Sequence, residues 1–311
     1  MGITHFDDAF ATEYDLGHLQ GRWTLLGEAA GSVTVGLKRI QIPTGGWSTP
    51  AHEHGRSEEI FYVLAGSGVS WQRGDTAEIR AGDAIVYRPH SGPHTVRADD
   101  KLDLLAFGTR EHDEALRFAQ LDMIVIGNRA VPVAPRASRG VPIQFEREAE
   151  QGPPELPARS GPRPSTIVNL YDLEPSTVKR PRVERTRRNF GRAAGSQRSG
   201  LQHVEVAPGK ESAPLHCHSI EEEMFVILDG DGVLILDREE TPVRPGHVIS
   251  RAAATGVSHV FRAGPGGLIY LAYGTRDPGD ICYYPRSNKI AFGGVGVIAR
   301  LERLDYWDGE D

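Results

Sequence analysis

The sequence contains little cysteine and no long apolar segment. Its two cysteines, Cys217 and Cys282, are too few for a disulfide framework and are typical of a reducing compartment. No segment approaches the roughly eighteen consecutive apolar residues of a membrane-spanning helix. Residues 1–10 lack both the basic region and the apolar region of a signal peptide. We therefore expect a cytoplasmic protein.

An excess of positive charge is also absent. The 35 Lys and Arg residues are outnumbered by 42 Asp and Glu residues, which gives a net charge of −7. This balance implies no general attraction to nucleic acid or to an anionic membrane, so we expect neither as a partner. A small-molecule substrate is the expected partner, and assembly into a homo-oligomer stays open.

Long segments with helical periodicity are lacking as well. The 36 glycines and 21 prolines separate short apolar runs, such as residues 60–64 and 224–228, which are too short for helices. Residues 33–42 and 200–206 alternate polar and apolar side chains with the period of a strand. No crossover helices separate these strands, so the sequence predicts an all-β fold with antiparallel sheets.

Two histidine-rich segments, 164 residues apart, share one pattern. The recurring positions are Gly45, His52, His54, Glu59 and Gly66 in the first segment, and Gly209, His216, His218, Glu223 and Gly230 in the second. The two histidines of each segment are separated by one residue, so both imidazoles leave the same face of an extended strand. With the carboxylate, they make up most of a divalent-metal site.

The repeat extends beyond the histidines and indicates a tandem duplication. Residues 27–32, 81–83 and 106–110 correspond to residues 191–196, 245–247 and 272–276, and the offset grows from 164 to 166. We predict an N-terminal barrel over residues 1–130, a linker over 131–165 and a C-terminal barrel over 166–311. The strongly basic segment 180–198 is expected to be a solvated connecting arm.

A further histidine follows each copy of the pattern. His94 comes after Gly82 and Gly92, and His259 comes after Gly246; the glycines permit the turn that returns the chain toward the earlier ligands. The predicted metal ligands are therefore His52, His54, Glu59 and His94 in the first half, and His216, His218, Glu223 and His259 in the second. Three neutral imidazoles and one carboxylate suit a divalent transition metal at each site, with Fe(II) or Mn(II) favoured and Ni, Co, Zn or Cu as alternatives.

Both motifs resemble those of the cupin superfamily, and their tandem occurrence resembles a bicupin. The resemblance implies two double-stranded β-helix barrels of the jelly-roll type, each with a metal inside. The cupin pattern places six residues between the ligand glutamate and the following glycine, which selects Glu59 and Glu223. Because neighbours on a strand point to opposite faces, we expect Glu58 and Glu222 to be solvated.

The resemblance leaves several functions open. An intact site with three histidines and one glutamate implies first a non-haem, metal-dependent oxygenase of the dioxygenase type, in which Glu59 or Glu223 also acts as a catalytic base. The alternatives are a redox-neutral lyase, isomerase or hydrolase, and a bicupin that binds a small molecule without catalysis. Nothing in the sequence decides which of the two sites is catalytic.

The position of a substrate-binding cation separates this chain from one group of bicupins. Oxalate decarboxylases carry an arginine three residues before the first ligand histidine, whereas Thr49 and Ala213 stand there in this chain. Arg88 and Arg251, at matching places before the fourth ligands, are alternative carboxylate clamps or surface residues.

Overall fold

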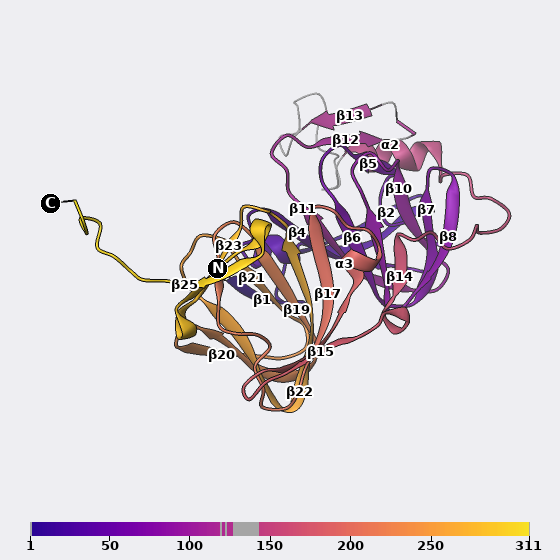
Figure 1. The fold of residues 1–311 in the computed structure, drawn as a ribbon. Helices are drawn as coiled ribbons and strands as arrows, with labels where there is room; N and C mark the ends of the chain where they lie inside the picture. The colour runs from indigo at the N-terminus through magenta and orange to yellow at the C-terminus, as the bar shows by residue number, and fades with distance from the viewer. Residues whose placement is uncertain (1, 119, 122, 127–142, 311) are drawn as a thin grey trace.

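The computed structural model describes residues 2–118, 120–121, 123–126 and 143–310, and antiparallel strands dominate it (Figure 1). The expected all-β fold with two tandem cupin-like barrels is confirmed. The helices are short: α1 (Leu26–Ala29), α2 (Ile143–Gln151), α3 (Phe190–Ala193) and the single turns η1 (Leu170–Asp172), η2 (Pro285–Ser287) and η3 (Gly293–Val295). Within the described part of the chain, none of them has the length and apolarity needed to cross a membrane.

The N-terminal barrel consists of two sheets. The larger sheet has the order β14 (Ile167–Asn169), β9 (Asp83–Tyr87), β6 (Glu59–Ala65), β11 (Leu102–Thr109), β4 (Val35–Ile42), β3 (Leu19–Thr24) and β2 (Ala11–Leu16). The opposing sheet has the order β13 (Met123–Ile126), β12 (Ala115–Phe118), β5 (His52–His54), β10 (His94–Ala98), β7 (Ser67–Gln72) and β8 (Asp75–Arg80).

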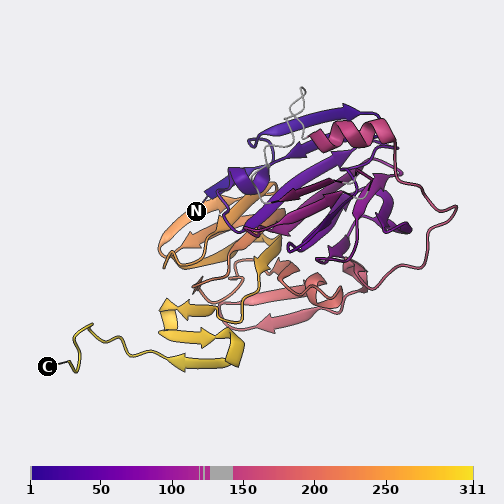
Figure 2. The same cartoon turned by 90° about the horizontal axis from the view of Figure 1, so that it is seen from above.

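The C-terminal barrel repeats this plan with longer, continuous strands. Its main sheet has the order β1 (Gly2–His5), β21 (His247–Arg251), β19 (Glu223–Leu236), β22 (His259–Thr275), β17 (Ser199–Val206), β16 (Glu184–Asn189) and β15 (Ser176–Lys179), with β20 (Glu239–Val243) beside β19. A separate small sheet follows the order β18 (Cys217–His218), β23 (Ile281–Tyr284), β24 (Lys289–Phe292) and β25 (Val297–Arg300), and its yellow strands lie at the side of the barrel (Figure 2).

Each barrel contains a strand that comes from the other half of the sequence. β1, from the N-terminus, pairs with β21 of the C-terminal barrel, and β14 pairs with β9 of the N-terminal barrel. Sheet pairing thus crosses the predicted boundaries at residues 130 and 166, which stay predictions. Of the predicted linker 131–165, residues 131–142 lie outside the described residues, and residues 143–151 form α2.

The basic segment 180–198 is part of a sheet, so our expectation of a solvated arm was wrong. It contains β16, which pairs along its length with β17. Strand alternation then sorts its arginines between two faces. Arg188 forms an ion pair with Glu205, whereas Arg185 and Arg187 line a cavity inside the C-terminal barrel. Charge density alone suggested exposure to solvent, but the strand has one face in the barrel.

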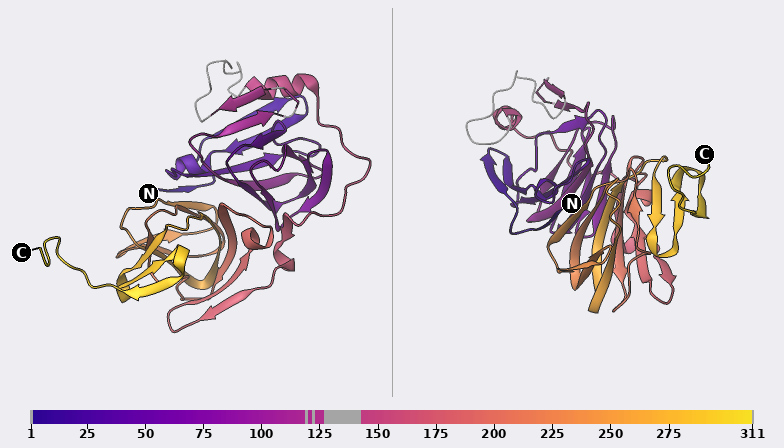
Figure 3. Two further views of the ribbon diagram at one scale, coloured as in Figure 1. Left: turned by 45° about the horizontal axis from the view of Figure 1, so that its top comes forward. Right: turned by 90° about the vertical axis from the view of Figure 1, so that its left-hand side faces the viewer.

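The apolar runs at residues 60–64 and 224–228 are strands buried on both faces, as predicted. In β6, Phe61 and Val63 belong to the interior cluster of their own barrel, and Ile60 and Tyr62 belong to a cluster shared by both barrels. The two main sheets pack against each other through this shared cluster (Figure 3). The rings of Phe107 and Tyr273 stack across it with centroids 5.0 Å apart.

The glycine that ends each run allows a close backbone contact. Gly66 and Gly230 have φ values of +85° and +75°, which side chains rarely allow. A β-carbon at these positions would lie 1.7 Å from the carbonyl oxygen of Lys101 and 2.2 Å from that of Gly267. Glycine at these positions therefore lets the backbone of each strand lie against the neighbouring turn without a steric clash.

Glu58 and Glu222 are buried between the barrels, so the expectation that they are solvated was wrong. Glu58, 0% exposed, accepts hydrogen bonds from Ser196 Oγ at 2.6 Å and from Ser199 N and Oγ at 3.1 and 2.6 Å. In return, Glu222, 2% exposed, accepts a hydrogen bond from Thr34 Oγ1 at 2.7 Å. The face of the strand opposite the ligand glutamate abuts the other barrel rather than water.

We expect Glu58→Ala to lower the free energy of unfolding by about 3 kcal/mol, because it leaves several buried donors of the other half without an acceptor. Glu222→Ala should have a similar effect. Glu78→Ala, at an exposed position of β8, is the matched control. Denaturant titration measures the free energy of unfolding of all three variants. Equal unfolding midpoints for Glu58→Ala and Glu78→Ala would contradict a stabilising role of Glu58 between the barrels.

Candidate metal centres

The four predicted ligands of the first half meet inside the N-terminal barrel. His52 and His54 come from β5, Glu59 begins β6 and His94 begins β10. One donor atom from each lies within 4.8 Å of the others. Glu59 Oε2 is 3.0 Å from His94 Nε2, 3.2 Å from His54 Nε2 and 3.9 Å from His52 Nε2. The structure therefore brings the whole predicted set together.

This arrangement fits a divalent transition metal. Neighbouring ligands on an octahedral or tetrahedral ion with bonds of about 2.1 Å lie roughly 3.0–3.4 Å apart, close to two of these separations. Burial, together with His94 and His54, lowers the pKa of His52 to about 3, so this imidazole is neutral and has a free lone pair. Burial disfavours the charged form of Glu59, but His54 and His94 outweigh it and hold its pKa well below the ordinary value.

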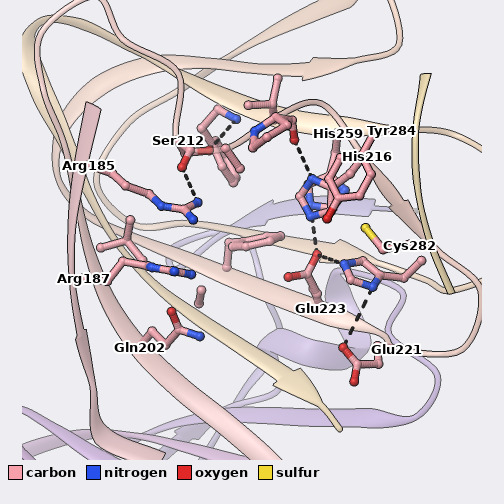
Figure 4. Close-up of a pocket in the computed structure, with 18 of the residues that line it drawn as sticks. Arg185, Arg187, Gln202, Ser212, His216, Glu221, Glu223, His259, Cys282 and Tyr284 are labelled. Carbon is pink, nitrogen blue, oxygen red and sulfur yellow. Dashed lines mark hydrogen bonds and ion pairs between the residues drawn. The ribbon is translucent and has the colours of Figure 1, made fainter. Parts of the chain in front are cut away.

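The four predicted ligands of the second half lie around a wider gap in the C-terminal barrel (Figure 4). His216, Glu223 and His259 form one cluster, in which His259 Nε2 is 2.9 Å from Glu223 Oε2. His218 Nε2 lies 3.6 Å from the same oxygen and belongs to adjacent groups with Cys282 and with Asp280. His218 Nε2 is buried without a hydrogen bond to any described residue, and Glu223 Oε2, in contact with His259, is the acceptor atom nearest to it among the predicted ligands. A cation between them would satisfy both atoms.

A second carboxylate orients one histidine of each centre. His54 Nδ1 lies 3.6 Å from Glu114 Oε2, and His218 Nδ1 lies 2.6 Å from Asp280 Oδ2. Backbone N–H groups fix both acids: Ser57 N donates to Glu114 and Ile220 N donates to Asp280. Such partners fix the ring orientation of a metal-binding histidine and raise its basicity.

The sequence interpretation missed Glu114 and Asp280, although a signal for them exists. They are separated by the same 166 residues as Arg110 and Arg276 at the end of the recognised repeat. The first histidines have equivalent supports too: His52 Nδ1 is 2.8 Å from the carbonyl oxygen of Pro50, and His216 Nδ1 is 2.8 Å from that of Pro214. These contacts fix which ring nitrogen faces the centre.

The two centres differ in how much empty space adjoins them. A cavity of about 420 Å³ opens onto His216, His218, Glu223 and His259. Its walls include Arg185 and Arg187 from β16, Gln202 from β17, and Cys282 and Tyr284 from β23 (Figure 4). The corresponding part of the N-terminal barrel holds packed aromatic rings: Phe145 makes edge contacts with Tyr14 and Trp23, and all three ring centroids lie 5.1–5.5 Å apart.

Strand register puts Trp23 in the place of Arg187, and Tyr14 reaches over Gly21, the counterpart of Arg185, from the neighbouring strand. Trp23 pairs with Ile40 as Arg187 pairs with Val204, at positions 164 residues apart. The hydroxyl of Tyr14 donates to the carbonyl oxygen of Ser48, and the guanidinium of Arg185 donates to the equivalent carbonyl of Ser212. Aromatic side chains thus fill, in the N-terminal barrel, the space that two cations occupy in the C-terminal barrel.

The two arginines considered from sequence as carboxylate clamps, and Tyr87 beside Arg88, make contacts within the protein. Arg251 is 3% exposed, donates to the carbonyl oxygen of Val257 and does not line the cavity. Arg88 lies beside Gly195 of the other half. Tyr87 is buried and stacks on His94, with ring centroids 3.8 Å apart. Arg88 and Arg251 are therefore absent from the cavity wall, which carries Arg185 and Arg187.

Comparison with known proteins identifies the two halves separately. The family model for the cupin domain matches residues 38–107 and 202–264. An uncharacterized protein of Methanocaldococcus jannaschii is 36% identical over 64 residues, which are 21% of this chain. The match spans half the length of that relative.

Solved structures match across both barrels. A variant of Bacillus subtilis oxalate decarboxylase aligns with a TM-score of 0.58 and 17% identity, covering 90% of this chain and 78% of that one. The same enzyme at pH 4.6 aligns with a TM-score of 0.56 and 16% identity, over 88% and 75% of the two chains. At this identity the likeness shows a shared two-barrel fold.

We expect the purified protein, supplied with Fe(II) or Mn(II), to approach two metal ions per chain by elemental analysis. Bound metal should stabilise the fold by about 2.7 kcal/mol at 100 times the dissociation constant, because it links strands distant in sequence. Chelation should lower the melting temperature, and His216→Ala should retain about one ion. An unchanged melting curve after verified removal of metal would contradict this account.

Asp280→Asn should weaken metal binding at the second centre by about 10-fold to 100-fold, because His218 loses its charged partner. The measurement is a metal titration in a His54→Ala background, which removes the first centre. Asp277→Asn is the control, since Asp277 lies on the same cavity wall and no ion pair joins it to a histidine among the described residues. Equal affinities for the two variants would exclude the orienting role.

Proposed function

Because this chain is a bicupin, a member of the cupin superfamily with two tandem cupin domains, we propose that it is a transition-metal-dependent enzyme whose reaction takes place in the C-terminal barrel. The observation that carries this proposal is the cavity of about 420 Å³ that meets the second donor set. That volume is sufficient for a small metabolite. The counterpart region around Tyr14, Trp23 and Phe145 is packed, which favours a structural role for the N-terminal centre.

The reaction proposed first is that of a dioxygenase. Three histidines and one glutamate leave two neighbouring positions of a six-coordinate ion unfilled by protein. A bound transition metal would polarise a ligating substrate and bring redox chemistry to the site. In a dioxygenase the substrate supplies the electrons and both oxygen atoms enter the product, so no additional reductant is required.

The protein's own groups have separate roles in this proposal. Glu223 is held as an anion, because His259, His218 and His216 together outweigh the effect of burial and lower its pKa. Its oxygen facing the centre can accept a proton from a substrate that binds there. Phe225 and Tyr284 form apolar parts of the wall and limit access of water to the reacting atoms.

A redox-neutral lyase is the second candidate, and its support is the two-barrel likeness to oxalate decarboxylase. Decarboxylation needs a metal and a proton donor but consumes no dioxygen. Glu221, which lines the same cavity and whose pKa is raised by burial, could provide the donor. Thr49 and Ala213 stand where oxalate decarboxylases carry an arginine, so a larger carboxylate is a better candidate than oxalate itself.

Oxygen uptake by Fe(II)-loaded protein, screened over diketones, phenols and small carboxylates, tests the first candidate. We expect Glu223→Gln at saturating metal to lose about 100-fold or more in turnover, because the base is removed while an oxygen ligand remains. Glu59→Gln, the matched change in the other barrel, should keep turnover within a few-fold of wild type.

The same screen separates the candidates. Product formation under strict anaerobiosis, with carbon dioxide release and no oxygen uptake, would replace the dioxygenase by the lyase. Loss of activity in Glu59→Gln alone would move the reaction to the N-terminal barrel. Metal-loaded protein that binds ligands in the cavity but converts none would identify a binding protein.

A further inference from the structure

Arg185 and Arg187 form a pair of cations on the wall of the C-terminal cavity. They lie two residues apart on β16, so their side chains leave the same face of the strand, toward the barrel interior. Figure 4 shows their guanidinium groups on one side of the cavity and His216 and His259 on the other, with Glu223 between. The pair therefore faces the metal ligands across free space.

No carboxylate neutralises this pair within the described residues. Arg185 donates to the carbonyl oxygen of Ser212, while its buried Nε has no hydrogen-bond partner there. The next arginine of the strand, Arg188, has such a partner in Glu205. Burial, and then the neighbouring Arg187, lower the pKa of Arg185. Two adjacent guanidinium groups without an anion are costly unless a ligand supplies the negative charge.

We propose that Arg185 and Arg187 bind a carboxylate group of the substrate while the opposite end of the same molecule ligates the metal at the second centre. This inference rests on the proposed function for the identity of the metal-binding end. The planar guanidinium matches a carboxylate with paired hydrogen bonds, and the Gln202 amide on the same wall adds a neutral donor. The substrate class is a small molecule with a carboxylate at one end and a metal-ligating oxygen group at the other.

The charges of the remaining wall favour a carboxylate over a phosphate monoester. Glu221, Asp277 and Asp280 line the same cavity, and their negative charge opposes a dianion more than a monoanion. Among the described residues the N-terminal barrel lacks this cationic pair, because Trp23 stands in the place of Arg187, Gly21 in that of Arg185, and the Tyr14 hydroxyl takes the hydrogen bond of Arg185. Carboxylate binding should therefore be confined to the C-terminal barrel.

The test measures binding by calorimetry to the full chain loaded with Zn(II), an ion without redox chemistry. The probes are succinate and glutarate, with succinamide as the neutral analogue and inorganic phosphate as the competing anion. We expect a dicarboxylate to bind in preference to succinamide and phosphate. Arg187→Gln and Arg185→Gln should each weaken its binding by about 10-fold or more.

Arg188→Gln is the matched control, because it removes an arginine from the opposite face of the same strand. The affinity of this variant for the dicarboxylate should equal that of wild type. Unchanged binding in Arg187→Gln and Arg185→Gln, equal binding of succinamide, no binding of either dicarboxylate, or preference for phosphate would each overturn the inference. Zinc content and oxygen uptake, measured separately, test the proposed function, so its failure would be distinguishable from loss of the carboxylate site.

Discussion

Adjacent glutamates at the beginning of one strand in each barrel connect the metal centre to the contact between the barrels. Glu59 points into the N-terminal barrel, where it meets three histidines, and Glu58 points out of it to the Ser196–Ser199 turn. Glu222 and Glu223 divide in the same way. Since neighbouring side chains of a strand point to opposite faces, a shift of one residue would exchange both roles. The interface contact therefore fixes the register that places the ligand.

The duplicated plan supports two different surroundings because the metal ligands and the cavity walls come from different strands. The ligands come from the segments that carry the repeated pattern, whereas the distinguishing residues lie on the outer strands β2, β3 and β16. Substitution there leaves the donor set in place. Tyr14 and Arg185 reach equivalent carbonyl oxygens, so one hydrogen bond is satisfied by either an aromatic hydroxyl or a cation.

The fold class and the eight candidate ligands could be predicted from the sequence, since both depend on local spacing: strand period, glycine turns and alternating histidines. Four of these residues meet in the first barrel, and in the second His218 lies beside a cluster of the other three. Prediction from the sequence failed where the answer depended on what lies opposite a strand. In the sequence Glu58 resembles an exposed acid, but in the fold the second barrel covers it. Segment 180–198 likewise resembles a solvated arm, but its strand β16 pairs with β17. Glu114 and Asp280 lie four residues beyond the recognised repeat, at the same offset of 166, and are acids of different length.

Charge distribution gives a physical reason for the division between the barrels. The charge of a metal ion in the N-terminal barrel would be compensated by Glu59 and, through His54, by Glu114. Packed aromatic and aliphatic side chains surround this centre. The C-terminal centre has the equivalent acids Glu223 and Asp280, and its cavity adds two guanidinium groups that form no ion pair with a described residue. Among the described residues, the second barrel thus combines a cavity with two guanidinium groups that form no ion pair, although four acids line the same cavity. A small anion can pair with those guanidinium groups, whereas Trp23 and Tyr14 fill the corresponding space in the N-terminal barrel.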